Sequence, residues 1–220
     1  MKILFLTTWY FPNNTGAAVV MHNLVKNINR NYVHGVVTSA NNFYDKFEII
    51  DNINVYKIFN FQYLFIPRIR TYVNDIAFRF EAQKVKRIIK NNNITHVVGV
   101  YPDLKFLELA NFVSKTDDVK FIPYLHDTVV EGLSHTRFKK ISKTIQKDVF
   151  KESSKILVMS EGMKKLYSQK YGINTIPIVH SFSEEIEVKK INKDKINESL
   201  FWGGSIYSIN KECLKRIEES

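Results

Sequence analysis

Polar side chains that could take part in chemistry directly follow two of the apolar runs in this 220-residue chain. His126 and Asp127 end one run, and a histidine beside a carboxylate can transfer a proton or hold a sugar hydroxyl. Tyr101 and Asp103 follow another run in the same way. A lone His-Asp pair is more often structural, but its place at the end of a strand makes a functional role equally reasonable.

Two further candidate sites stand where helices are expected to begin. Gly16, two residues after Asn14, opens an amphipathic stretch, and the free N–H groups of a helix N-terminus suit a phosphate or a polar sugar group. A plain turn explains this loop about as well. Ser160 and Glu161 follow another apolar run, and Ser160 is also typical of an N-cap, for a short helix that ends at Gly172.

The order of apolar and amphipathic stretches predicts the elements that position these residues. Near-continuous apolar runs with helices between them favour a parallel sheet covered on both faces. The fold class is therefore α/β, with a Rossmann-like parallel sheet flanked by helices. Ligands bind outside the carboxyl ends of the strands in such sheets. We expect a helix over 16–29 and strands over 2–8, 35–39, 53–59, 95–100, 120–125, 155–160 and 175–179.

The net charge of +10 comes entirely from two segments, 67–91 and 137–155, each with seven basic and two acidic residues. Both also carry an apolar stripe at helical spacing, which predicts a packing face with the charges opposite. The charges form either a solvated face or a surface that docks on anionic lipid. No nucleic-acid-binding motif is present, so nucleic acid is not an expected partner. The stripes are Ile69, Val73, Ile76, Phe80, Val85, Ile88 and Ile89, and Phe138, Ile141, Ile145 and Val149.

Several classes of protein can be set aside. Cys213 is the only cysteine, which excludes an internal disulfide and favours a reducing compartment. No apolar run approaches the roughly 18 residues of a spanning helix, and no signal peptide is evident. We therefore expect a cytoplasmic protein. The six histidines show no metal-ligand spacing, and the chain lacks a Walker A sequence, a G-x-G-x-x-G loop and a G-x-S-x-G elbow.

The C-terminal part changes in composition. Residues 184–199 are charged and poor in aromatics, as in a linker, and residues 200–220 read as a strand, a glycine turn and a helix. These predict an N-terminal domain over 1–183 and the beginning of a second α/β domain. The last unit either packs on the first domain or belongs to a larger protein of which the chain is a fragment; we favour the fragment.

The order and spacing of four pieces resemble the retaining glycosyltransferases of family 4, which have the GT-B fold. The resemblance covers essentially the whole chain. The first pieces are Lys2 to Pro12 with Gly16, and Leu125-His126-Asp127. The others are Ile156 to Met163 with Tyr171-Gly172, and Phe201-Trp202-Gly203-Gly204-Ser205.

This resemblance implies two Rossmann-like domains that face each other across a cleft and work without a metal or other cofactor. The N-terminal domain would bind the acceptor, and the C-terminal domain a nucleotide-sugar donor. His126 would lie at the reacting centre, supported by Asp127. Many members have an arginine where this chain has Ser205, and Ala17 replaces a second glycine. The acceptor residues would be Asn14, Gly16, Tyr101, Asp103, Ser160 and Glu161, and the donor residues Gly203, Gly204, Ser205 and Lys211.

The expected function is transfer of a sugar from a nucleotide-sugar to a saccharide or lipid-linked acceptor, in the synthesis of a capsule, lipopolysaccharide or other surface polysaccharide. One side of a cleft cannot position both substrates, so we expect the chain to be inactive alone. The basic helices would bring it to the inner face of the cytoplasmic membrane as a peripheral protein. The alternative is a non-catalytic basic module that docks on an anionic membrane or a partner protein. A different GT-B enzyme, such as an epimerase, is a third option.

Overall fold

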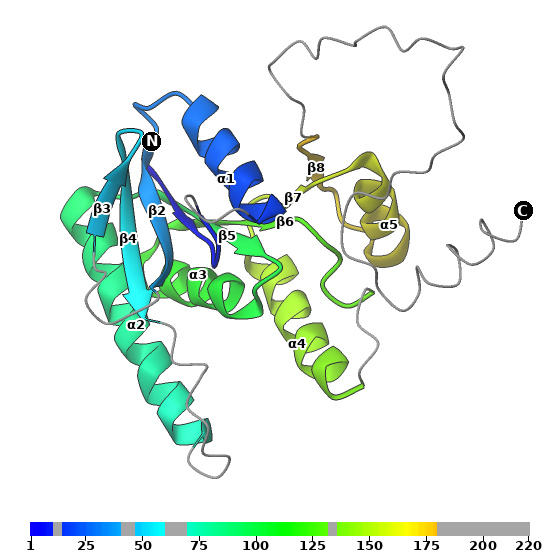
Figure 1. Ribbon diagram of the computed structural model, residues 1–220. Helices are drawn as coiled ribbons and strands as arrows, with labels where there is room; N and C mark the ends of the chain where they lie inside the picture. Colours follow the sequence, from blue (N-terminus) through cyan, green and yellow to red (C-terminus); the bar gives the residue numbers. More distant parts are fainter. Residues whose placement is uncertain (11–14, 41–46, 60–69, 132–135, 180–220) are drawn as a thin grey trace, which may run out of the picture. The chain divides into compact units, whose positions relative to one another are not determined.

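The computed structural model describes residues 1–10, 15–40, 47–59, 70–131 and 136–179 (Figure 1). They belong to a unit that spans Met1–Ser181. The predicted linker 184–199 and the predicted start of a second domain, 200–220, lie outside the described residues, so the division into domains stays a prediction. No described helix is long and apolar enough to cross a membrane.

An eight-stranded sheet forms the centre of this unit, and its strand order is β3-β4-β2-β1-β5-β6-β7-β8. Every pairing is parallel except that of β3 with β4. The predicted α/β class with a mostly parallel sheet is therefore confirmed. The strands are β1 (Ile3–Leu6), β2 (Val33–Ala40), β3 (Phe47–Ile50), β4 (Ile53–Phe59), β5 (His96–Tyr101), β6 (Lys120–Leu125), β7 (Leu157–Val158) and β8 (Ile176–Pro177).

The helices cover both faces of the sheet, because alternate side chains of each buried strand point to opposite sides. Leu4 and Leu6 of β1 join a core with α2, α3, α4 and α5, whereas Phe5 joins a second core with α1. Figure 1 shows α1 apart from α2, α3 and α4. The helices are α1 (Gly16–Asn27), α2 (Arg70–Asn92), α3 (Leu104–Asp117), α4 (Thr136–Glu152) and α5 (Glu161–Tyr171).

Two elements were not predicted from the sequence. Helix α3 carries apolar residues on most of its circumference, so its helical period is weak; Phe106, Leu107 and Leu109 are all buried. Strand β3 is an antiparallel edge strand, and its residues alternate between exposed and half-buried. Asp51 and Asn52 connect it to β4, and both have a positive φ. Asparagine and aspartate tolerate this conformation, and it matches a tight hairpin turn.

The predicted packing stripes are only partly correct. Val85 and Ile89 of α2 and Val149 of α4 are buried as expected. Ile76 and Phe80 of α2 are 55 % and 65 % exposed instead. Ile141 of α4 is also exposed, at 51 %. The residues of α2 that pack into the core lie on one face and include Phe78, Ala82, Val85 and Ile89. Because a helix turns about 100° per residue, Ile76 and Phe80 lie on the opposite face, away from the core.

Helix α3 approaches the sheet closely over Gly99 of β5. A Cβ atom at this position would lie 2.6 Å from Cβ of Ala110 and 3.2 Å from Cε2 of Phe121. Real side chains do not pack at the first of these distances, so the helix could not keep its place above a larger residue. Glycine at this position therefore fixes the distance between α3 and β5.

We expect Gly99→Ala to lower the free energy of unfolding by about 1–3 kcal/mol, the usual cost of overpacking a core. Urea denaturation measures this directly. Gly162→Ala is the matched control, because a Cβ atom there would meet only Ser160 Oγ, at 3.6 Å. This variant should leave the free energy of unfolding unchanged or raise it slightly. Equal stability of the two variants would contradict the close approach of α3.

Candidate functional site

The predicted site residues of the described part follow adjacent strands. Strands β1, β5, β6 and β7 are consecutive in the sheet, so their carboxyl ends form one continuous edge. Thr8 follows β1, Asp103 follows β5, and His126 follows β6. Two hydrogen bonds join these strand ends: His126 N donates to the carbonyl of Tyr101 over 3.2 Å, and Thr8 Oγ1 donates to Asp103 Oδ2. The structure therefore brings these residues to one edge.

His126 and Asp127 differ in their surroundings although they are neighbours in the chain. His126 is buried, and its ring lies edge-to-face against Tyr124 with the centroids 4.5 Å apart. Asp127 is exposed. The imidazole is thus held by packing, whereas the carboxylate is available to solvent or to a ligand.

Tyr101 is the buried phenol of this edge, with 6 % of its surface exposed. Burial raises the pKa of Tyr101, and the negative charges of Asp127 and Asp103 raise it further. Both effects disfavour the phenolate. Tyr101 therefore stays protonated at neutral pH, and its hydroxyl can donate a hydrogen bond.

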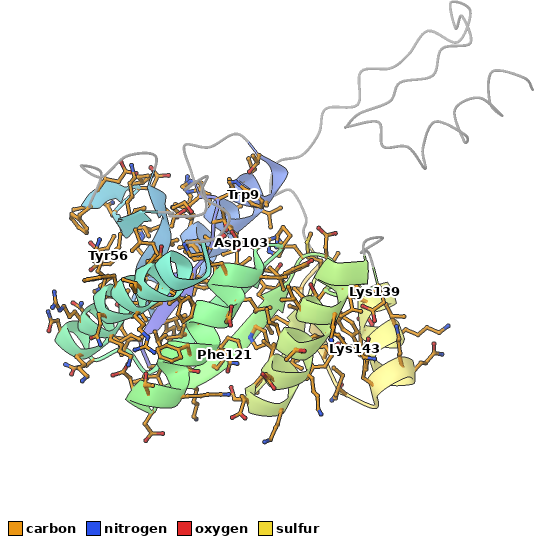
Figure 2. The ribbon with its side chains drawn as sticks, turned by 90° about the horizontal axis from the view of Figure 1, so that it is seen from below. Trp9, Tyr56, Asp103, Phe121, Lys139 and Lys143 are labelled. Carbon is orange, nitrogen blue, oxygen red and sulfur yellow. The ribbon has the colours of Figure 1, made fainter. Side chains whose placement is uncertain are left out.

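Asp103 has a clear structural role at the start of α3 (Figure 2). It is the N-cap of this helix, and its Oδ1 accepts a hydrogen bond from Lys105 N over 2.8 Å. Its Oδ2 accepts the hydrogen bond from Thr8. Both carboxylate oxygens are thus engaged within the protein, and Asp103 joins the ends of β1 and β5. Its predicted contact with an acceptor stays a prediction.

Ser160 is an N-cap as well, as the sequence predicted. Its Oγ accepts a hydrogen bond from Met163 N over 3.1 Å, and α5 ends at Gly172 in the left-handed conformation. The side chain of Glu161 is 68 % exposed and lies 3.5 Å from Lys164 Nζ. Glu161 is therefore accessible to a ligand, whereas the Ser160 hydroxyl already has a structural bond.

The loop before α1 is described only in part. Thr15 is the N-cap of α1, and its Oγ1 accepts a hydrogen bond from Ala18 N over 3.3 Å. A Cβ at Gly16 would meet no described atom within 4 Å, and the residue does not have a positive φ. Packing against the described residues therefore does not require a glycine here. Asn14 lies outside the described residues.

The predicted donor residues Gly203, Gly204, Ser205 and Lys211 also lie outside the described residues. Within the described ranges, no group of three or more histidine, cysteine, aspartate or glutamate side chains is placed to hold a metal ion. The expectation that the chemistry needs no metal stays a prediction.

A buried ion pair that the sequence did not indicate joins α2 to α3. Lys105 Nζ of α3 lies 2.7 Å from Glu81 Oε1 of α2, and the Glu81 side chain is only 2 % exposed. Burial raises the pKa of Glu81, although the hydrogen bond and charge of Lys105 act in the opposite direction. Glu81 looked like one charge among many on a basic helix, and only the packing of α2 on α3 shows that it is buried.

Comparisons with known proteins give a fold but no family. No protein-family model matches the chain, and no curated protein is similar to it in sequence. A sucrose-phosphate synthase from Thermosynechococcus elongatus has a similar structure, with a TM-score of 0.60 and 10 % identity over 79 % of this chain and 46 % of that one. HepE from Anabaena, solved in complex with UDP, gives a TM-score of 0.54 and 16 % identity over 83 % of this chain and 44 % of that one.

At these identities the similarity shows a shared α/β fold. The chain spans less than half the length of both similar structures. The activity of a whole protein of this kind is therefore a matter for proposal.

We expect Lys105→Met to lower the free energy of unfolding by about 3 kcal/mol at neutral pH, because it leaves the Glu81 carboxylate buried without its partner. The double variant Glu81→Met/Lys105→Met should recover most of this loss, as measured by denaturant unfolding.

The stability lost in Lys105→Met should also depend on pH. Glu81 has a raised pKa in the folded protein, so its contribution to stability is present in full below the unfolded value and falls as the pH rises through the folded value. The destabilisation by Lys105→Met should therefore shrink when acid protonates Glu81. The same loss at acidic and neutral pH would contradict a buried charge at this position.

Proposed function

We propose that this chain is the acceptor-side part of a retaining glycosyltransferase of family 4 type. It would act in the synthesis of a surface polysaccharide such as a capsule or lipopolysaccharide, with a nucleotide-sugar as donor and a saccharide or lipid-linked saccharide as acceptor. The observation that carries the proposal is the shared edge of β1, β5 and β6, where Tyr101, His126 and Asp127 gather in a fold of this kind.

The similar structures support the nucleotide-sugar part of the proposal. One of them is by name a sucrose-phosphate synthase, and the other was solved with UDP. UDP is the nucleotide portion of many sugar donors. Because the chain spans less than half of each, we assign to it the acceptor site and only the first residues of a donor site, which are Gly203, Gly204, Ser205 and Lys211.

Each candidate residue has a role that its surroundings allow. The protonated phenol of Tyr101 would donate a hydrogen bond to an acceptor oxygen, and the exposed carboxylate of Asp127 would accept one from a sugar hydroxyl. His126 would contact the reacting sugar from its packed position beside Tyr124. Hydrogen bonds of this kind act by holding the acceptor in one orientation, which is the main requirement of sugar transfer.

The test uses the 220-residue chain with a panel of saccharides, free and linked through diphosphate to a short prenyl chain. Calorimetry should detect binding of at least one of them, and His126→Ala or Asp127→Asn should weaken it about tenfold, as expected for one lost hydrogen bond. Lys57→Ala, on β4, is the control and should bind normally.

Two results would count against the proposal. Failure of every saccharide to bind would remove the acceptor site. Sugar transfer from a nucleotide-sugar by the 220-residue chain alone would show that it is not an acceptor-side part.

Helix α4 provides a specific reason to place this acceptor site at an anionic membrane. Lys139, Lys143 and Lys147 are exposed at successive turns, with Lys140 beside them, and none forms an ion pair with a described residue (Figure 2). Like charges one turn apart destabilise a helix by repulsion. An anionic lipid surface would neutralise this repulsion and attract the row of lysines.

We expect the chain to bind vesicles that contain phosphatidylglycerol and not vesicles of phosphatidylcholine alone. Lys139→Glu/Lys143→Glu should lower this binding by tenfold or more, since each basic residue near the headgroups contributes about 1 kcal/mol. Lys120→Glu/Lys165→Glu makes the same change of charge at other exposed lysines and serves as the control in a sedimentation assay. Equal loss in both double variants would show that net charge matters and that α4 is not the docking surface.

A further inference from the structure

The loop between β6 and α4, which begins with His126 and Asp127, is attached to helix α5. Val129 N donates a hydrogen bond to Tyr167 Oη over 3.4 Å, and both residues are completely buried. Two residues further on, the side chain of Glu131 reaches the last turn of the same helix. The loop is thus tied to β5 at His126 and to α5 at two later points.

The carboxylate of Glu131 has two donors on α5. Its Oε1 accepts one hydrogen bond from Tyr171 Oη and another from Lys170 Nζ over 2.9 Å. The Glu131 side chain is 15 % exposed, so these bonds are largely protected from water. Burial alone would raise the pKa of Glu131, but the hydrogen bonds from Tyr171 and Lys170 hold it below its usual range.

The donors themselves are fixed by packing. The rings of Tyr167 and Tyr171 both lie edge-to-face against Phe150 of α4, with centroid distances of 5.4 and 5.5 Å. Glu131 therefore connects the loop to a rigid aromatic cluster between α4 and α5, rather than to a mobile surface lysine alone.

We infer that Glu131 is a positioning residue, which holds the His126–Asp127 loop in place through Tyr171 and Lys170 of α5. This inference rests on the proposed function of His126 and Asp127 at the saccharide site. Glu131 does not need to touch the saccharide. It restricts the motion of the loop, and so fixes the positions of the His126 imidazole and the Asp127 carboxylate. Catalytic and binding groups must be held within a narrow geometry, so a loop that moves freely would bind the acceptor weakly.

The test compares Glu131→Ala and Glu131→Gln in the 220-residue chain. In Glu131→Ala we expect the amides of residues 127–131 to exchange their hydrogens about tenfold faster, the effect of losing a hydrogen bond to a charged group. The ring resonances of His126, assigned with a His126→Gln variant, should shift or broaden. Glutamine keeps an oxygen for Tyr171, so Glu131→Gln should restore most of the His126 signal.

Glu152→Gln is the matched control. Glu152 is also a partly exposed glutamate paired with a lysine, Lys115, at 3.6 Å, but it joins α3 to α4. The Glu152→Gln variant should change neither the hydrogen exchange of the loop amides nor the ring resonances of His126. If Glu131→Ala does not fold, Tyr171→Phe removes one donor and leaves the loop sequence intact.

Three outcomes overturn the inference: unchanged exchange of the loop, faster exchange without any change at His126, or the same changes in Glu152→Gln. The second would mean that Glu131 has only a structural role. Saccharide binding, measured on the same samples, separates this inference from the proposed function. If the unaltered chain binds no saccharide while the loop responds as expected, the proposed function fails and the positioning of His126 stands.

Discussion

The parallel pairing of β5 with β1 and β6 is the constraint on which the candidate site depends. Tyr101 lies opposite Leu125, so β5 and β6 end at the same level, and Leu6, the last residue of β1, lies opposite Gly99, two residues before the end of β5. Gly99 lets α3 lie directly on β5. Asp103 is the N-cap of α3, and its side chain also accepts a hydrogen bond from Thr8, which follows β1. The loops that carry the polar residues therefore start from fixed points on one edge.

Much of this fold could be predicted because buried parallel strands have a simple pattern. The bounds of β4 and β6 agree with the expected runs 53–59 and 120–125, and the caps of α5 at Ser160 and Gly172 are as expected. Strands β7 and β8 are shorter than the predicted runs 155–160 and 175–179. An apolar run at the edge of a sheet can continue past the last backbone hydrogen bond to the neighbouring strand, so its length does not give the length of the strand. The exposed Ile76 and Phe80 show that helical spacing alone does not identify what a face packs against.

The site could be predicted less completely. The order of strands in the sheet places Tyr101, the last residue of β5, beside the end of β6, which His126 follows. The N-cap role of Asp103 was not predicted because α3 itself was not, and its bond to Thr8 joins residues far apart in the sequence. Glu81 and Glu131 depend on contacts between distant elements, with Lys105 and with Tyr171. Such long-range polar pairs leave no periodic signal in a sequence, so they require a structure.

The central claim is that the carboxyl edge of β1, β5 and β6 binds a saccharide. Chemical-shift mapping by NMR on the labelled chain, titrated with the saccharide that binds best, tests it most directly. The account predicts that the largest amide shifts fall at Thr8, Tyr101 and Asp127, with β3 and the amino ends of the strands unchanged. Shifts confined to other surfaces, such as the exposed side of β3, would contradict it.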